Sequence, residues 1–308
     1  MRARRFIRGG ILHRSIFYPY LALRPLLEAY WLRRLGIDPQ PASELRDSVT
    51  PLVRVRNEDV WIETILRTLC KVFPHVVVIE NGSDDLTPGI LKELVAEGLP
   101  LAVVSYADPF GNDGLVRNIV LDNLVRTRWW YIVDGDELQL EASCRAVLDA
   151  CAGDQHNDRY FMSAHARYLH PDCVLKVTRP FAPEVAHKFG RVYNTGLVRF
   201  PEPGWRDTPL VGPLNRYISG RLLPENAVWL PDAHYLHAAF SQRSTIAAWK
   251  GYGSIHSRHI HRRDRNYRTE ESAYEPLSVF PKEFLECRYS GHNPYRTQIL
   301  DATNLSFV

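Results

Sequence analysis

Three carboxylates around one glycine form the part of this sequence with the clearest chemical meaning. Asp134, Asp136 and Glu137 come directly after WWYIV, a run of five apolar residues that indicates a buried strand. In an extended chain, residues two apart point to the same side, so Asp134 and Asp136 can converge on one ligand, and Gly135 lets it approach the backbone. Mg²⁺ and Mn²⁺ take one or two carboxylates and complete their shell with water and phosphate oxygens. The spacing favours a divalent-metal site, and the alternative is an Asp-Gly hairpin turn.

Two later histidines are candidates to complete this metal shell. His234 and His237 lie in HYLH, after the short apolar run AVWLPDA, and either could bind a metal as a neutral imidazole. His237 is the favoured ligand, because a loop leading to Lys250 follows it. The alternative is that both are ordinary packed or surface histidines.

The segment 249–268 gathers basic and aromatic side chains with Asp264 as its one acid. Its cations and rings are Lys250, Arg258, Arg262, Arg263, Arg265, Arg268, Trp249, Tyr252 and Tyr267. Such a segment could bind nucleic acid through phosphates and stacking, or could be a solvated basic face. Beside a metal-phosphate site, a lid hinged at its glycines is the preferred interpretation, with Lys250 and Arg258 contacting the phosphates.

The elements that must position these residues alternate between strand and helix from residue 49 onwards. Strands are expected at 51–56, 76–80, 101–105 and 129–133, with helices after Asn57, after Thr87 and at 113–126. Asn57 is a candidate cap of the first helix, whereas Thr87 as N-cap and Gly98 bracket the second. This βαβαβαβ series predicts an α/β fold with a mostly parallel sheet and helices on both faces.

Polar residues follow three of the predicted strands. Parallel sheets of this kind bind ligands at the carboxyl ends of their strands, where Arg56 and Asn57, the stretch 80–85 and the acid cluster fall. No GxGxxG follows the first strand and no GxxxxGKS/T occurs, so a dinucleotide fold and a P-loop are disfavoured.

Four motifs in order give the chain a family resemblance. RVRNEDVWIETILRTL, VVVIENGSDDLTPGIL, Arg117 and WWYIVDGDE together resemble the nucleotide-sugar-binding half of the family 2 glycosyltransferases, which have the Rossmann-like GT-A fold. The resemblance covers roughly residues 50–140. Glu80 stands where the family usually has Asp, and Leu86 where Gly is common.

The resemblance implies roles for individual residues. Arg56, Asn57, Glu80 and Asp85 would hold the base and ribose of the donor, and Arg117 would contact the donor or order the acid cluster. Asp134 would reach the ribose, the metal or metal-bound water, while Asp136 would bind the Mn²⁺ or Mg²⁺ that bridges the diphosphate. The structural alternative for these polar residues is a helix cap or a surface loop.

The catalytic base of an inverting transferase has to lie in the acceptor half, opposite the leaving diphosphate. Asp207 in PGWRDTP is the first candidate, followed by Glu137, Glu225 and Asp232. The family's usual Glu-Asp pair is not visible in this chain.

The ends of the chain differ from its middle. Residues 1–37 carry eight arginines and one acid, Glu28, among many aromatic residues. This composition is typical of a helix lying on an anionic membrane, and the alternative is an extension packed on the catalytic domain or an oligomer contact. We expect an N-terminal extension at 1–48, a catalytic domain at 49–240 that divides after residue 140 into donor and acceptor halves, and a basic tail at 241–308.

The whole chain has the composition of a globular protein. It is 45% hydrophobic with a net charge of +3, too small to define a partner, and its five cysteines form no CxxC pair. A reducing cytoplasm, with peripheral membrane contact through the N-terminus, is the expected location.

The predicted function is metal-dependent inverting glycosyl transfer from a nucleotide sugar, most simply a UDP-sugar, to a glycan, lipid-linked sugar, protein or nucleobase. The alternatives are a sugar-nucleotide nucleotidyltransferase and a non-catalytic nucleic-acid or membrane-binding protein.

Overall fold

The computed structural model describes most of the first half of the chain and parts of the second. The described residues are 20, 22–39, 46–107, 113–153, 160–169, 175–177, 191–196, 198–200, 202, 227–237, 244–245 and 273–275. Within these ranges, no helix combines the length and the apolar character needed to cross a membrane.

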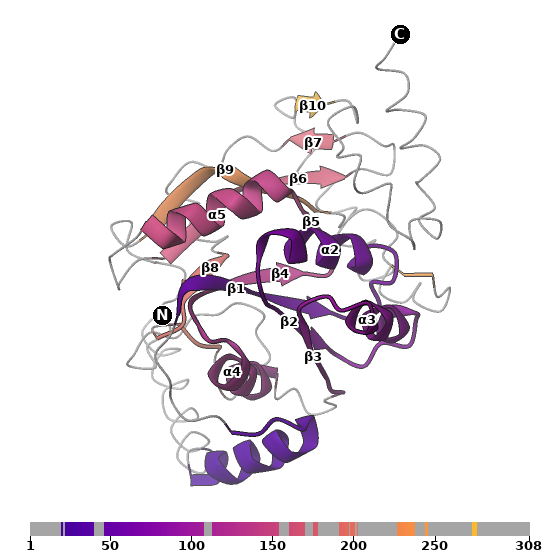
Figure 1. Ribbon diagram of the computed structural model, residues 1–308, viewed down its shortest axis with the longest axis vertical. Coiled ribbons are helices and arrows are strands. Elements are labelled where there is room, and N and C mark those ends of the chain that lie inside the picture. Colours follow the sequence, from indigo (N-terminus) through magenta and orange to yellow (C-terminus); the bar gives the residue numbers. More distant parts are fainter. Residues whose placement is uncertain are drawn as a thin grey trace, which may run out of the picture.

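The first part of the chain builds the predicted parallel sheet (Figure 1). Its elements are β1 (Arg46–Val55), α2 (Ile62–Val72), β2 (Val76–Glu80), α3 (Thr87–Ala96), β3 (Leu101–Ser105), α4 (Asp113–Leu124) and β4 (Thr127–Asp134). β1 pairs in parallel with β2 and with β4, and β2 pairs in parallel with β3. The predicted α/β class and βαβαβαβ series are therefore confirmed.

The second part extends the same sheet with mainly antiparallel strands. Its elements are β5 (Glu137–Gln139), α5 (Glu141–Gly153), β6 (Tyr160–Leu169), β7 (Leu175–Val177), β8 (Val192–Asn194), β9 (Ala227–His237) and β10 (Ala273–Glu275). The strand order is β10-β7-β6-β8-β4-β1-β2-β3, and β9 pairs with both β5 and β6. Because β5 pairs with β9, β4 and β5 do not form a hairpin, and the hairpin interpretation of the Asp-Gly pair is wrong.

The two faces of the sheet have separate hydrophobic cores, as the continuous apolar strands require. Alternate side chains of β4 divide between them: Trp129 packs with α2, α3 and α5 on one face, and Trp130 packs with α4 on the other. Figure 1 shows α2 and α5 on one side of the sheet and α4 on the opposite side. Helices thus cover both faces of the sheet, and the ends of the strands form the edge between these two helical layers.

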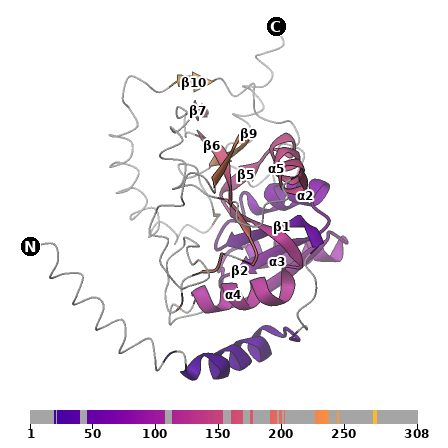
Figure 2. The same ribbon diagram turned by 90° about the vertical axis from the view of Figure 1, so that its left-hand side faces the viewer.

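The N-terminal helix (residues 22–35) lies against the α4 side of the molecule (Figure 2). Trp31 is buried in the core of that face and meets the ring of Tyr106 edge-on at 5.9 Å between centroids. Ile37 is buried beside it. The part of the N-terminal extension that the structure describes therefore packs on the α4 face of the sheet, which agrees with the sequence interpretation of a packed extension.

Two predicted helix caps are wrong. Helix α2 begins at Ile62 with Trp61 as its N-cap, five residues after Asn57, so Asn57 does not cap it. Helix α3 has Leu86 as its N-cap and Pro88 in its first turn, while Thr87 is already helical. The Thr87 hydroxyl instead accepts a hydrogen bond from the backbone N–H of Glu58, at 3.0 Å. Both side chains form hydrogen bonds with residues of neighbouring loops instead of capping the start of a helix.

Candidate functional site

The register of the parallel strands brings three of the predicted polar clusters to one edge of the sheet. Val55 of β1 is the Cα partner of Glu80 in β2, and Arg54 of β1 is the partner of Asp134 in β4. The chain leaves all three strands at the same level, so the loop 56–61, the loop 81–86 and the turn 134–137 are neighbours. The structure thus places Arg56, Asn57, Glu80, Asp85, Asp134 and Asp136 along one edge, as predicted.

Asn57 connects the first two loops. Its φ of 55° lies in the left-handed region, which asparagine tolerates better than most residues. This turn lets its N–H donate to Ser83 Oγ at 2.9 Å, while its Oδ1 accepts from the Asp84 N–H at 2.8 Å. The side chain is fully buried, and its Nδ2 has no hydrogen-bond partner among the described residues. This edge of the sheet therefore holds a buried amide donor without a hydrogen-bond acceptor among the described residues.

The acids of the second loop form hydrogen bonds that shape it. Glu80 is buried and its Oε1 accepts from the Ser83 N–H at 2.5 Å. Asp85 Oδ1 accepts from the Thr87 N–H at 2.9 Å, at the start of α3. These contacts match the helix-cap and loop alternative that the sequence left open for each acid.

Two residues from far along the chain join this loop pair. Ser244 Oγ donates to Asp85 Oδ2 at 2.6 Å, and the Thr245 N–H donates to Asp59 Oδ1 at 2.9 Å. Burial raises the pKa of Asp59, against the lowering effect of its hydrogen bonds from Thr245. The chain just before the basic segment 249–268 is therefore anchored at the ends of β1 and β2.

Two arginines hold the first acid of the turn after β4. Arg54 Nε donates to Asp134 Oδ1 at 2.9 Å, and Arg191 lies 3.5 Å from the other oxygen, Oδ2. The Asp134 N–H in turn donates to Glu137 Oε2 at 3.1 Å, which closes the turn. Asp136, between them in sequence, is 3% exposed.

Arg191 is the centre of this acid turn. Its guanidinium donates to Glu137 Oε1 and to the Tyr235 hydroxyl, the latter at 2.7 Å. Burial by itself lowers the pKa of Arg191, but Glu137, Tyr235 and Asp134 together raise it well above its ordinary value. The arginine is permanently charged and ties the acid turn to β9.

Gly135 is required by the protein's own packing. A Cβ at this position would lie 2.6 Å from Glu58 Cγ and 3.3 Å from the Arg54 carbonyl oxygen. Glu58 thus fills the space that a Cβ of residue 135 would occupy, and the approach of a ligand to the Gly135 backbone stays a prediction. The assumption of an extended chain fails, since residues 135 and 136 form a turn rather than continuing β4.

For His234 and His237 the structure describes the backbone alone. His237 is the Cα partner of Glu137, so the pairing of β5 with β9 brings its backbone beside the acid turn. His234 is the Cα partner of His165 in β6, further from that turn in register. Among the side chains that the structure describes, no three of His, Cys, Asp and Glu are grouped so as to hold a metal ion.

The two predicted donor-binding arginines have different surroundings. Arg56 is exposed at the end of β1. Arg117 of α4 is 6% exposed, and its guanidinium lies 5.2 Å from the centre of the Phe200 ring. Asp207, Glu225, Lys250 and Arg258 lie outside the described residues, and of Asp232 the structure describes only the backbone.

Sequence reasoning missed several residues of the site: Arg54, Glu58, Asp59, Arg191, Tyr235, Ser244 and Thr245. A signal existed for Arg54, a charge inside a strand otherwise buried on both faces, which needs an acidic partner. Nothing local to Arg191 or Thr245 marks them, because their partners lie 54 and 186 residues away.

No protein-family model and no curated protein matches the chain. Among solved structures, it is similar to S. aureus TarS 1–349 in complex with UDP, at 18% identity and a TM-score of 0.43, over 84% of this chain and 71% of that one. Against the longer TarS structure the identity is 20% and the TM-score 0.44, and the match spans 43% of that chain.

A second similar structure is the mannosyltransferase PcManGT from Pyrobaculum calidifontis in complex with GDP-Man and Mn²⁺. It is 16% identical with a TM-score of 0.43, over 97% of this chain and 87% of that one. Glucosyl-3-phosphoglycerate synthase from Mycobacterium tuberculosis is 12% identical with a TM-score of 0.39, over 71% and 79%. The similarity is low in each case, so the function has to be argued from the site.

Proposed function

We propose that the protein is a GT-A glycosyltransferase that uses a nucleotide sugar, with a UDP-sugar as the donor, and transfers the sugar with inversion. The observation that carries this proposal is the shared sheet edge, where the acid turn after β4 adjoins the polar loops after β1 and β2. Open parallel sheets bind their ligands at this edge. The acceptor class remains a glycan, a lipid-linked sugar, a protein or a nucleobase.

A divalent cation, Mn²⁺ or Mg²⁺, fits Asp136 better than Asp134. Two guanidinium groups already oppose Asp134, and they would repel a dication placed against the same carboxylate. Asp136 and the imidazole of His237 would form a donor set that suits Mn²⁺, with water and diphosphate oxygens as further ligands. When bound, the cation would stabilise the negative charge of the leaving diphosphate.

Asp134 keeps a different task in this proposal. With both oxygens oriented by Arg54 and Arg191, it presents a fixed acceptor to a ribose hydroxyl or to water. Glu137 is ion-paired and 1% exposed, which favours a role in holding the turn over the predicted role of catalytic base. Asp207 is then the proposed base, which takes the proton of the attacking acceptor hydroxyl.

The loops after β1 and β2 would bind the nucleotide. The Asn57 Nδ2 amide is a buried donor that a base carbonyl can satisfy, which would remove the cost of leaving it unpaired. Arg56, exposed at the same edge, would pair with the diphosphate. Glu80 and Asp85 would preserve the loop shape through their backbone contacts, and Arg117 would support the site from α4.

The anchor at Ser244 and Thr245 supports the proposed lid. Lys250 follows Thr245 by five residues, and a fully extended chain of that length spans at most about 18 Å. Thr245 itself is held by Asp59 at the end of β1. Lys250 could therefore reach a diphosphate at this edge, and Arg258 would follow it on the lid.

A thermal-shift and calorimetric screen of UDP- and GDP-sugars, each with and without Mn²⁺, tests the proposal. We expect one donor to bind in a metal-dependent way to the native chain and to Asp149→Asn, an exposed acid of α5 that serves as the matched control. Asp136→Asn should lose the metal-dependent part of the binding while it unfolds at a similar temperature without ligand. Selective binding of a nucleoside triphosphate, with no response to any nucleotide sugar, would instead identify a nucleotidyltransferase.

A further inference from the structure

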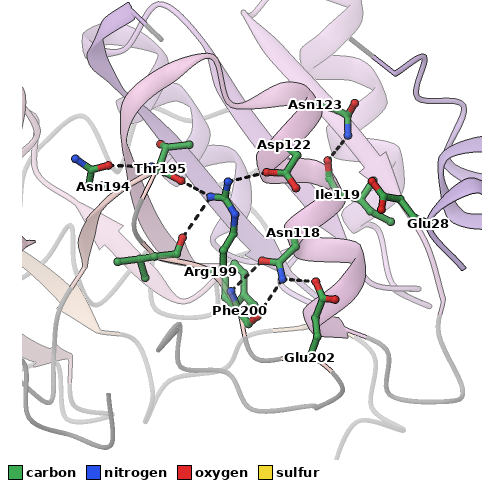
Figure 3. A network of polar contacts seen from close by, with 12 residues as sticks. Glu28, Asn118, Ile119, Asp122, Asn123, Asn194, Thr195, Arg199, Phe200 and Glu202 are labelled. Atoms are coloured by element: carbon green, nitrogen blue, oxygen red, sulfur yellow. Dashed lines mark hydrogen bonds and ion pairs between the residues drawn. The ribbon is translucent and has the colours of Figure 1, made fainter. Parts of the chain in front are cut away.

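The contacts that the N-terminal helix (residues 22–35) makes with the other described residues lie on one side of it. Arg24 Nε donates to Glu202 at 2.9 Å and pairs with Glu28, and the Tyr20 hydroxyl, one turn earlier, donates to Glu202 at 2.6 Å. Glu202 itself is held by Asn118 of α4, as Figure 3 shows. Together with Trp31, these contacts form the inward stripe of the helix.

The residues just before Glu202 are bound to α4. Asn118 Nδ2 donates to the Phe200 carbonyl and its Oδ1 accepts from the Phe200 N–H, both at 2.9 Å. Arg199 pairs with Asp122 of α4 at 2.8 Å (Figure 3). The helix is thus fixed on α4, and its other side has a defined direction, away from the molecule (Figure 2).

That outward side carries large apolar residues. Leu23, Leu26 and Tyr30 are 53%, 68% and 53% exposed. They are three of the five exposed large hydrophobic residues in the described part of the chain, and the other two, Leu86 and Val95, lie in or next to α3. Their spacing of three and four residues places them on one stripe of the helix. This stripe lies roughly a third of the way around the helix from the packed stripe that holds Arg24 and Trp31.

The same side is positively charged. Arg33 and Arg34 are exposed, and Glu28, the one acid of residues 22–35, pairs with Arg24 on the packed side. The sequence before the helix adds Arg2, Arg4, Arg5, Arg8 and Arg14 and no acid. The partner of this surface has to offer negative charge and an apolar layer together.

We propose that the outward face of the N-terminal helix, defined by Leu23, Leu26, Tyr30, Arg33 and Arg34, docks on an anionic lipid bilayer. An amphipathic helix of this kind inserts its apolar side chains at the headgroup boundary while its arginines contact the lipid phosphates. Nucleic acid supplies the charge without an apolar layer. A second copy of this helix would bring the same positive charge and be repelled.

Deleting residues 1–37 would be a poor test, because it removes Trp31 and Ile37 from the core. The double variant Leu23→Ser/Leu26→Ser changes only exposed side chains, and Leu86→Ser/Val95→Ser is its control with two exposed hydrophobic residues elsewhere. The experiment is cosedimentation of the full chain with vesicles of phosphatidylcholine alone or mixed with phosphatidylglycerol, at low and high salt.

We expect the native chain and the control to bind the mixed vesicles, with binding weakened by salt and absent from pure phosphatidylcholine. Leu23→Ser/Leu26→Ser should bind at least about tenfold more weakly, and Arg33→Gln should reduce the salt dependence. Equal binding by both double variants would overturn the proposal. So would a change of oligomeric state in Leu23→Ser/Leu26→Ser without a change in vesicle binding, which would assign the face to a protein contact.

Discussion

Replacing Arg191 with methionine should destabilise the protein by about 3–5 kcal/mol, as expected when one partner of a buried ion pair is removed. The guanidinium binds Glu137 and the Tyr235 hydroxyl and lies 3.5 Å from Asp134 Oδ2. Asp134 keeps Arg54 in the variant, whereas Glu137, whose side chain is 1% exposed, would be left charged and buried. Most of the loss should therefore arise from Glu137.

A double-mutant cycle identifies that source. In Arg191→Met/Glu137→Gln the buried charge is gone, and the Gln amide oxygen can still accept the Asp134 N–H. We expect the double variant to regain at least about 1.5 kcal/mol relative to Arg191→Met, measured as the free energy of unfolding in urea. A loss below about 1 kcal/mol in the single variant, typical of an exposed pair, would refute the reasoning. Absence of any recovery in the double variant would refute it equally.

Three further changes test other parts of the structure. Gly135→Ala should destabilise by about 1–3 kcal/mol in urea unfolding, because the new Cβ would lie 2.6 Å from the buried Glu58; a neutral effect would show that the turn has room. Trp31→Ala should cost about 3–5 kcal/mol, as for a core tryptophan, whereas a loss typical of a surface site would mean that the N-terminal helix is not part of the fold. Burial lowers the pKa of His75 below 6.5, so the unfolded state takes up a proton before the folded state does, and stability present above pH 6.5 falls as the pH drops below it. His75→Gln should flatten that fall in unfolding measured between about pH 7.5 and 5, and an unchanged pH slope would contradict it.

The parallel half of the fold could be predicted because its signals are local. The strands Val76–Glu80 and Leu101–Ser105 match their predicted bounds, since each is a short apolar run, rich in valine, between polar loops. The edge that carries the site followed from the order of the strands alone. What these elements do not specify is the conformation of the loops between them.

The loop and turn errors share a physical cause. Asparagine favours helix caps, which predicts a cap at Asn57, but its left-handed backbone connects two loops across 26 residues of sequence. The regular strand before the acid turn favours an extended chain, and the close approach of Glu58 to Gly135 in the observed turn is a tertiary contact that the sequence does not show. Arg191 and Thr245 were missed for the same reason, since only the folded sheet brings them to their acids.

The N-terminal segment shows where two interpretations were too exclusive. Its arginines and aromatic residues indicate either a membrane helix or a packed extension. The sequence alone does not show which of these residues form an inward stripe and which form an outward stripe. Trp31 lies in the core while Leu26 is exposed five residues earlier. Only the identity of the neighbouring surface, α4 with Glu202, decides which stripe faces inward.

Release of nucleoside diphosphate from a panel of UDP- and GDP-sugars, measured with Mn²⁺, with Mg²⁺ and with EDTA, tests the central proposal most directly. We expect the native chain to consume one of these donors, EDTA to stop the reaction, and Asp136→Asn to lower the rate by on the order of 10² or more. The control Asp149→Asn should react like the native chain. Turnover that persists unchanged in EDTA or in Asp136→Asn would contradict the metal mechanism, and the absence of turnover with every donor would contradict the assignment as a glycosyltransferase.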